Sequence, residues 1–376
     1  MSRLRVLHIH AGNLYGGVET LLLTLARQTK AAPDVEHRLA LCFEGRLSAE
    51  IREMGASGVK VRTLGAVRAS RPWTVWRARG RIKDLLKSER PDAVMFHSAW
   101  SHGLFAKVAR KAKIPIVFML HGAVEELAWP ERKARKIPPD LALCVSQFVA
   151  TTLPKLFPDV RPEVLYPPVM RRAPTDAEAI AMRRSLGAPG NEVVVLQIGR
   201  MEPLKGHAVL LDALARLDGT SWLCWIVGGP QRAEEKKYEA ALKAQAKKAG
   251  LTRVTFLGER SDIAKLMAAA DIVCQPNTGP EGFGLVFVEA LLAGRPVITS
   301  DIGAAPEIVD ASCGELVPAG DVARLRAALA GLIDNRAQRD ALGAAGPARA
   351  RSLCEPERQV KRLAEILAKG IARGAR

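Results

Sequence analysis

The chain has 376 residues and a formal net charge of +17, and 48% of its residues are hydrophobic and 25% are charged. This composition is typical of a globular protein and excludes a disordered or fibrous chain. The length exceeds what one hydrophobic core normally serves, so we expect two domains, and no apolar run approaches the roughly 18 residues that a membrane-spanning helix needs.

The N-terminus and the cysteines both indicate a cytoplasmic protein. The apolar run Val6–Ala11 is interrupted by His8 and His10 and leads into a glycine loop, so it does not resemble a signal peptide. The six cysteines are dispersed and include no Cys-x-x-Cys pair. This pattern favours small core residues in a reducing compartment over a disulfide framework.

The positive charge is concentrated in the first half of the chain. Residues 60–113 hold 14 Lys and Arg against 3 Asp and Glu. We therefore expect an anionic partner for this half. Nucleic acid is the less favoured partner, because the chain has no zinc finger, no RNP-like aromatic motif and only 5% aromatic residues.

Predicted strands and helices alternate along the first half, which is the pattern of a parallel sheet covered by helices. The predicted strands are Arg5–His10, Arg38–Phe43, Lys60–Thr63, Ala93–His97, Pro115–His121 and Leu141–Val145. The predicted helices include Val18 to about Gln28, Pro72–Lys87 and His102–Lys113, and the loop Gly12–Gly17 joins the first strand to the first helix.

The same alternation restarts in the second half. Consecutive prolines in Leu165–Val169 hold the chain extended and predict a linker. The strands predicted after it are Glu192–Ile198, Leu223–Val227, Val254–Leu257, Ile272–Gln275 and Pro296–Thr299. We predict an α/β protein with two Rossmann-like domains, residues 1–168 and 169–355, and a basic C-terminal helix within residues 356–376.

The segment Glu281-Gly-Phe-Gly-Leu-Val-Phe-Val-Glu289 places two carboxylates eight positions apart. Its glycines predict a tight turn, and Leu285–Leu292 predicts a mostly buried helix. Backbone N–H groups at a helix N-terminus bind phosphate, so this turn is a candidate anion site. The candidate residues at the turn are Phe283, Gly284 and Leu285. A plain loop with a solvated Glu281 is the alternative, but Glu289 on so apolar a helix argues for a bound partner.

This segment resembles the Glu-x7-Glu motif of the retaining family 4 glycosyltransferases. These enzymes have the GT-B fold, in which two Rossmann-like domains face each other across a cleft. The resemblance implies that Glu281 meets the donor sugar and that Glu289 binds the ribose hydroxyls of the nucleotide. It also implies that the C-terminal helix crosses back to the first domain.

A second candidate anion site is the basic segment Gly199-Arg-Met-Glu-Pro-Leu-Lys-Gly206, which resembles the Gly-Arg…Lys-Gly segment of the same family. Arg200 and Lys205 would lie at the carboxyl edge of the sheet, where open α/β folds bind ligands. A guanidinium and an ammonium there would neutralise a leaving diphosphate without a metal ion. No metal is expected, because the sequence has no D-x-D, no H-E-x-x-H and no Cys/His cluster.

The first domain contributes a glycine loop and a histidine. Gly16 and Gly17, with Glu19, resemble the family's Gly-Gly-x-Glu loop, whose backbone comes close to the donor phosphate; Glu19 also fits a helix cap. His121 ends a predicted strand, and the resemblance implies that it hydrogen-bonds the transferred sugar. His97 and His102 match no motif, so we interpret both as structural.

The resemblance implies transfer of a sugar from a nucleotide-diphospho sugar to a hydroxyl acceptor, with retention of the anomeric configuration and no cofactor. A sugar-nucleotide epimerase or a phosphorylase on the same fold would keep the same anion sites and is the alternative.

The helix Pro72–Lys87 suggests where an acceptor would come from. It carries apolar residues on one face, Arg and Lys around that face, and Trp73 and Trp76, which are typical of membrane interfaces. Our hypothesis is peripheral association with the inner face of an anionic membrane and a lipid-linked or otherwise anionic acceptor. Packing of the apolar stripe on the sheet is the alternative explanation.

Overall fold

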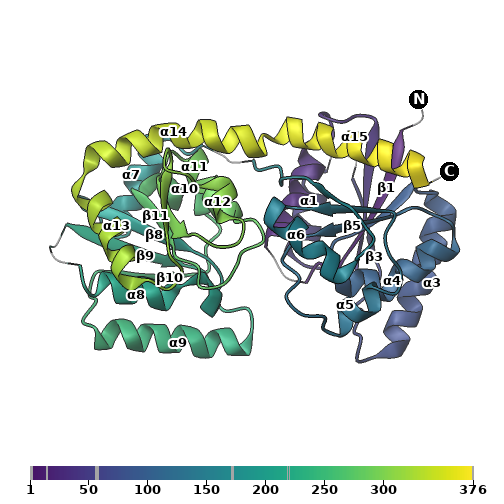
Figure 1. Ribbon diagram of the computed structural model, residues 1–376, viewed down its shortest axis with the longest axis horizontal. Helices are drawn as coiled ribbons and strands as arrows, with labels where there is room; N and C mark the ends of the chain where they lie inside the picture. The colour runs from purple at the N-terminus through teal and green to yellow at the C-terminus, as the bar shows by residue number, and fades with distance from the viewer. Residues whose placement is uncertain are drawn as a thin grey trace. The chain divides into compact units, whose positions relative to one another are not determined.

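The computed structural model describes residues 3–13, 16–55, 59–170, 173–217, 219 and 221–374. The chain divides into two compact units: unit 1 comprises Met1–Met170 and Cys354–Arg376, and unit 2 comprises Arg171–Leu353 (Figure 1). The division falls two residues after the boundary predicted from the sequence. The helix predicted near the C-terminus is grouped with unit 1. Of the predicted glycine loop, Leu14 and Tyr15 lie outside the described residues.

Unit 1 contains a seven-stranded sheet with the strand order β3-β2-β1-β4-β5-β6-β7, and each described strand pair is parallel. Its strands are β1 Leu4–His10, β2 Val35–Leu41, β3 Lys60–Thr63, β4 Ala93–Phe96, β5 Ile116–Leu120, β6 Leu141–Cys144 and β7 Pro162–Val164. Its helices are α1 Gly17–Arg27, α2 Arg46–Glu53, α3 Pro72–Glu89, α4 Ala99–Lys111, α5 Trp129–Ala134, α6 Gln147–Leu156 and α15 Pro356–Gly374.

Unit 2 contains a six-stranded parallel sheet with the order β10-β9-β8-β11-β12-β13. Its strands are β8 Val193–Ile198, β9 Trp222–Val227, β10 Val254–Gly258, β11 Ile272–Gln275, β12 Val297–Ser300 and β13 Gly314–Val317. Its helices are α7 Asp176–Ser185, the 3-10 turn η1 Pro203–Lys205, α8 His207–Leu214, α9 Ala233–Lys248, α10 Ile263–Ala269, α11 Leu285–Leu292, α12 Ala305–Ile308, α13 Val322–Asp334 and α14 Arg336–Cys354.

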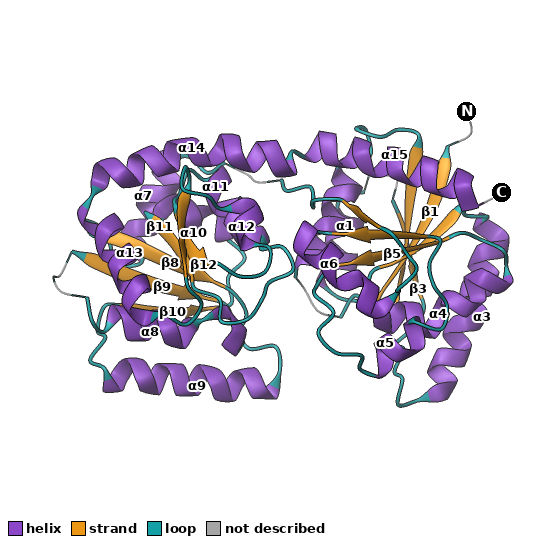
Figure 2. Ribbon diagram, viewed as in Figure 1, coloured by secondary structure: helices purple, strands orange, loops and turns teal. Residues whose placement is uncertain are grey.

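The apolar strands of both sheets are buried on both faces. Val193–Leu196 of β8 are at most 5% exposed, because helices cover both sides of the sheet (Figure 2). All six cysteines are buried and free, as expected for core residues. Within unit 1, α15 packs near β6, where a Cβ on Gly370 would lie 2.9 Å from Leu141 Cδ2.

The strand order of each sheet changes direction once. In unit 1 the first strand, β1, lies between β2 and β4, and in unit 2 the first strand, β8, lies between β9 and β11. Ligands of open α/β sheets bind outside the carboxyl ends of the strands at such a point. The loops that follow β1 and β4, and those that follow β8 and β11, are therefore the places to look for a site.

Candidate functional site

In unit 2, the carboxyl ends of β8 and β11 hold an ion pair between Lys205 and Glu281. Lys205 Nζ lies 2.6 Å from Glu281 Oε1. The other carboxylate oxygen, Oε2, accepts hydrogen bonds from Gln275 Nε2 at 3.0 Å and Asn277 Nδ2 at 2.9 Å. Both side chains of the ion pair are less than one-fifth exposed. Glu281 is thus held in one position, and Lys205 keeps further N–H donors for a ligand.

Close backbone packing holds these two loops together. Gly206 has φ 71°, and a Cβ at this position would overlap the carbonyl of Pro276. The amide N–H of Thr278 donates to Leu204 O at 2.9 Å, which joins the loop after β11 to the turn η1. On the other side of Glu281, its carbonyl accepts from Ala304 N at 3.1 Å. The ion pair therefore sits on two loops that are locked to each other.

Arg200, the other predicted basic residue, has different partners. Its guanidinium lies 2.6 Å from Glu202 Oε1 and 3.5 Å from Glu235 Oε1. Glu235 also accepts from the backbone N–H of Gln231 at 2.6 Å. The structure brings Lys205 and Glu281 together, whereas it pairs Arg200 with two carboxylates of its own.

The predicted turn and helix after Glu281 are present. Helix α11 spans Leu285–Leu292, as predicted, and Gly284 caps it with φ 96°, a conformation that favours glycine. Phe283 is buried, and Leu285 is half-buried at the helix start. Glu289 lies half-buried on α11, a little more than one turn from its N-terminus.

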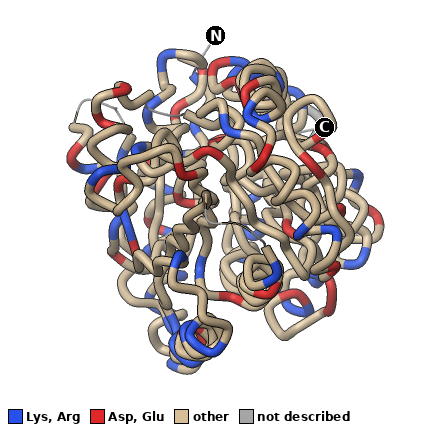
Figure 3. Tube along the Cα trace, turned by 90° about the vertical axis from the view of Figure 1, so that its left-hand side faces the viewer, with Lys and Arg blue, Asp and Glu red and all other residues tan. Residues whose placement is uncertain are grey.

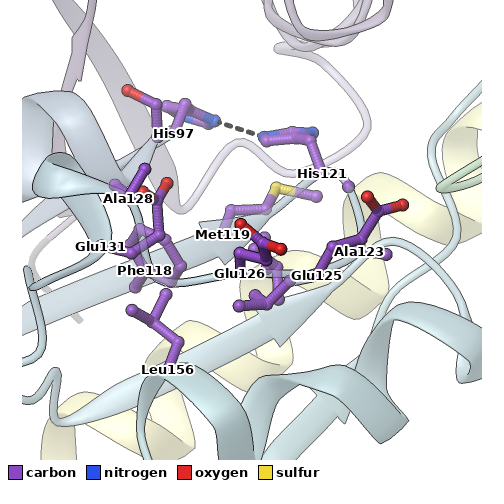
Figure 4. Close-up of a pocket in the computed structure, with 15 residues that line it drawn as sticks. His97, Phe118, Met119, His121, Ala123, Glu125, Glu126, Ala128, Glu131 and Leu156 are labelled. Carbon is purple, nitrogen blue, oxygen red and sulfur yellow. Dashed lines mark hydrogen bonds between the residues drawn. The ribbon is translucent and has the colours of Figure 1, made fainter.

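Unit 1 contains a cavity of about 510 Å³ beside His121 (Figure 4). His97 and His121 line one part of it, and Glu125, Glu126 and Glu131 supply three carboxyl groups. No Lys or Arg is among the lining residues, although the net charge of the whole chain is +17. The cavity therefore combines a largely apolar wall, with Phe118, Leu120 and Leu156, and a negatively charged part, which suits a ligand with hydroxyl donors better than phosphate.

His121 is the end of a row of four hydrogen-bonded histidines. His121 Nε2 lies 3.1 Å from His97 Nδ1, and His97 Nε2 lies 2.8 Å from His8 Nδ1. His8 Nε2 lies in turn 2.9 Å from His37 Nδ1. The four residues come from β1 and β2 and from the ends of β4 and β5, and we call them the histidine chain.

Burial keeps these imidazoles neutral. It lowers the pKa of His121 to about 3 and that of His37 to about 4, with a smaller contribution from neighbouring charge in each case. The pKa values of His8 and His97 are also well below the usual value, first because of burial and then because of neighbouring histidines.

Gly16 and Glu19 lie next to this row. Gly16 is the N-cap of α1, and its backbone N–H donates to Glu19 Oε2 at 2.9 Å. The other oxygen of Glu19 lies 2.6 Å from His10 Nε2. Glu19 therefore caps the helix, as one of the two predictions for it stated, and also contacts a buried histidine. Gly17 is the first residue of α1.

The two histidines that match no sequence motif have different surroundings. His97 joins His121 to His8 and lines the cavity. His102 is fully buried among Phe96, Phe118 and Phe157, with Nε2 at 2.7 Å from Ile137 O. The alternation of His8 and His10 in an apolar strand was the signal in the sequence that could have found the row.

Two family models match most of the chain. The model for glycosyltransferase family 4 matches residues 15–170, and the model for glycosyl transferases group 1 matches residues 179–349. The chain belongs to the family 4 glycosyltransferases. The two matched segments correspond to units 1 and 2.

Curated relatives match part of the chain. The chain is 43% identical over 169 residues to a phosphatidyl-myo-inositol mannosyltransferase of Mycobacterium leprae. This alignment covers 43% of this chain and 42% of that protein. The chain is also 33% identical over 198 residues to a D-inositol 3-phosphate glycosyltransferase of Mycobacterium marinum. This alignment covers 52% of this chain and 41% of that protein. The matches thus span less than half the length of these relatives.

Solved structures confirm the GT-B fold. HepE of Anabaena, crystallised with UDP and glucose, has a TM-score of 0.86 at 24% identity, over 97% of this chain and 100% of that one. Sucrose-phosphate synthase of Thermosynechococcus elongatus has a TM-score of 0.80 at 19% identity, over 99% and 100% of the two chains. At these identities the likeness concerns the fold alone.

Proposed function

We propose that this chain is a retaining glycosyltransferase that moves a sugar from a nucleotide-diphospho sugar to a hydroxyl acceptor. The observation that carries the proposal is the Lys205–Glu281 ion pair at the carboxyl edge of the unit 2 sheet, on the segment that resembles the family's Glu-x7-Glu motif. The family membership of both halves supports it.

In this proposal the donor binds to unit 2. Glu289 receives the ribose hydroxyls, and the turn of Phe283, Gly284 and Leu285 receives the diphosphate. Lys205 neutralises the charge that develops on the diphosphate as the glycosidic bond breaks, and Glu281 orients Lys205 and contacts the sugar. Arg200 adds to the positive charge once a phosphate competes with its two carboxylate partners.

We further propose that the chemistry needs no metal ion. Lys205 and the backbone N–H groups at the start of α11 would supply the positive charge for the leaving diphosphate in its place. Departure of the diphosphate leaves an oxocarbenium-like sugar. The acceptor hydroxyl attacks from the face that the diphosphate leaves, and its proton passes to a phosphate oxygen. His121, with the backbone near Gly16 and Gly17, would hold the transferred sugar during this step.

The first experiment identifies the donor. A panel of UDP-, GDP- and ADP-sugars is screened by thermal shift, because a ligand that binds the folded state raises the melting temperature. The hit is then incubated with hydroxyl acceptors, and the anomeric configuration of the product is determined by NMR. An inverted product contradicts retention. Release of an epimer or of a sugar phosphate without any acceptor supports the epimerase or phosphorylase alternative.

The second experiment tests Lys205. The variant Lys205→Met should lower kcat by roughly 100-fold or more, the magnitude typical of a lost charge-stabilising donor. Its affinity for a nucleoside monophosphate should change little, because charge develops on the diphosphate only during bond cleavage. The matched control is Lys237→Met, an exposed lysine on α9 of the same unit. Equal losses in turnover and in monophosphate binding would show that Lys205 is structural.

The surface of α3 supports a proposal about the acceptor. Its apolar stripe of Val75, Ala78 and Ile82 is buried within unit 1, so this stripe packs inside the domain and is not available to lipid. Trp73 and Trp76 remain 56% and 75% exposed. The helix also exposes five basic residues, Arg77, Arg79, Arg81, Lys83 and Lys87. Figure 3 colours the Lys and Arg residues of the described part of the chain blue.

We propose that this surface docks on the inner face of an anionic membrane and that the acceptor is lipid-linked. Exposed basic residues contribute about 1 kcal/mol each to such binding, and no helix in the described part of the chain is long and apolar enough to span a bilayer. The double variant Trp73→Ser/Trp76→Ser should reduce co-sedimentation with anionic vesicles at low salt, whereas Lys236→Gln/Lys237→Gln on α9 should not. Full activity on a soluble acceptor without any lipid dependence would contradict the proposal.

A further inference from the structure

The hydrogen bonds of the histidine chain all have the same pattern of ring atoms. Each of its three hydrogen bonds joins an Nδ1 atom to an Nε2 atom: His8 to His97 at 2.8 Å, His8 to His37 at 2.9 Å and His97 to His121 at 3.1 Å. The rings are therefore connected head to tail. His8, His37 and His97 are each at most 4% exposed.

This geometry restricts the protonation states. A neutral imidazole has one N–H donor and one acceptor nitrogen. His8 and His97 use both nitrogens within the chain, so each of them donates one hydrogen bond and accepts one. Since every bond joins Nδ1 to Nε2, all four rings must carry the proton on the same atom. Either all four are protonated at Nδ1 or all four at Nε2.

A single ring with the opposite proton position would place two N–H groups, or two lone pairs, against each other. Such a mismatch leaves buried polar atoms without a hydrogen bond, which is costly. A doubly protonated ring would donate from both nitrogens and would let the rings on its two sides carry opposite proton positions, but burial of these imidazoles disfavours the charged form. The charged or titratable neighbours of the row include His10 on β1, Glu19 on α1 and Arg3 at the start of unit 1. The carboxyl groups of the cavity that His97 and His121 line are those of Glu125, Glu126 and Glu131.

The nitrogen that His121 does not use in the row is Nδ1, and His121 lines the cavity of unit 1. We propose that His37, His8 and His97 are positioning residues that determine whether His121 Nδ1 donates or accepts a hydrogen bond in the cavity. His121 can change from donor to acceptor only if all four rings change together. The effect on a sugar hydroxyl rests on the proposed function, whereas the shared proton position does not.

The direct test is NMR of the full-length protein with ¹⁵N-labelled histidine side chains. Long-range ¹H–¹⁵N correlations distinguish imidazoles protonated at Nδ1 from those protonated at Nε2, and single substitutions assign the signals. At neutral pH, His8, His37, His97 and His121 should be neutral and share one proton position. One ring of the four with the opposite position, or with a full positive charge, overturns the proposal. This result needs no variant to be active.

The second test breaks the row at a distance from the cavity. The variant His8→Phe keeps a ring of similar shape but removes two of the three hydrogen bonds. The signals of His121 should then report a mixture of proton positions. The KM for the nucleotide sugar should rise by roughly 2- to 10-fold, as expected when one neutral hydrogen bond to the sugar is weakened. Nucleotide affinity, which belongs to unit 2, should stay unchanged.

The control is His102→Gln, which changes an equally buried histidine of unit 1 outside the row. It should leave the spectrum of His121 and the KM unchanged. If His8→Phe folds and both readouts of His121 match those of the original protein, the positioning role is refuted. If the original protein shows the shared proton position but turns over no nucleotide sugar, the proposed function is refuted, whereas the shared proton position of the four histidines is confirmed.

Discussion

Lowering the pH from 7 to 5 should destabilise unit 1 more than unit 2. Burial lowers the pKa of His37 and of His102, both in unit 1, to about 4. In unit 2, burial lowers the pKa of His207 to about 4. All three are nearly inaccessible to solvent, at most 4% exposed, so the folded state holds them as neutral rings down to about pH 4.

The sign and the size follow from proton linkage. An unfolded histidine has a pKa of about 6.5 and binds a proton below that pH, whereas the folded rings bind one only near pH 4. The free energy of unfolding therefore falls as the pH falls through this window. Each buried ring lowers the free energy of unfolding by about 1.4 kcal/mol for every pH unit below 6.5, which amounts to about 2 kcal/mol at pH 5.

Unit 1 should therefore lose about 4 kcal/mol through His37 and His102, and unit 2 about 2 kcal/mol through His207. His8, His97 and His121 add to the loss in unit 1, because burial lowers the pKa of all three. A loss of this size is a large part of the roughly 5–15 kcal/mol that stabilises a typical domain.

Native-state hydrogen exchange of the full chain at pH 7 and pH 5 measures the free energy of opening separately in the two units. The larger loss should appear in the strands of unit 1. The variant His102→Gln should reduce the acid sensitivity of unit 1 by about 2 kcal/mol, since it removes one of the titrating rings. Equal losses in the two units, or no loss in unit 1, would refute the linkage argument.

Two further predictions concern residues of unit 2, Glu289 on α11 and Gly206 between η1 and α8. Glu289→Gln should weaken nucleotide binding by roughly 10- to 150-fold, the equivalent of one hydrogen bond to a charged acceptor, and unchanged affinity by titration calorimetry would contradict the assignment. Gly206→Ala should destabilise unit 2 in urea by more than the roughly 1–2 kcal/mol that the left-handed backbone alone costs, because its Cβ would also overlap the Pro276 carbonyl. The control is Gly250→Ala, where φ is 67° but the space around the Cβ is open; equal losses in the two variants would contradict the overlap.

Local patterns in the sequence were sufficient for much of the fold. The strands Lys60–Thr63 and Ile272–Gln275 and the helix Leu285–Leu292 have the predicted bounds. An apolar run between turn residues determines the last two, whereas Lys60–Thr63 contains a single apolar residue, Val61. The edge strands β7 and β13 were not predicted. Each has at most four residues and includes a glutamate, so their strand conformation depends on pairing with a neighbouring strand.

The sequence by itself determined the fold class and the family, since these depend on short-range patterns. Only the tertiary structure decided which side chains meet. Lys205 and Glu281 are 76 positions apart and come together because β8 and β11 are neighbours in the sheet. The histidine chain likewise joins residues from four strands. A parallel sheet aligns the ends of distant strands, and no local pattern in a sequence records which ends become adjacent.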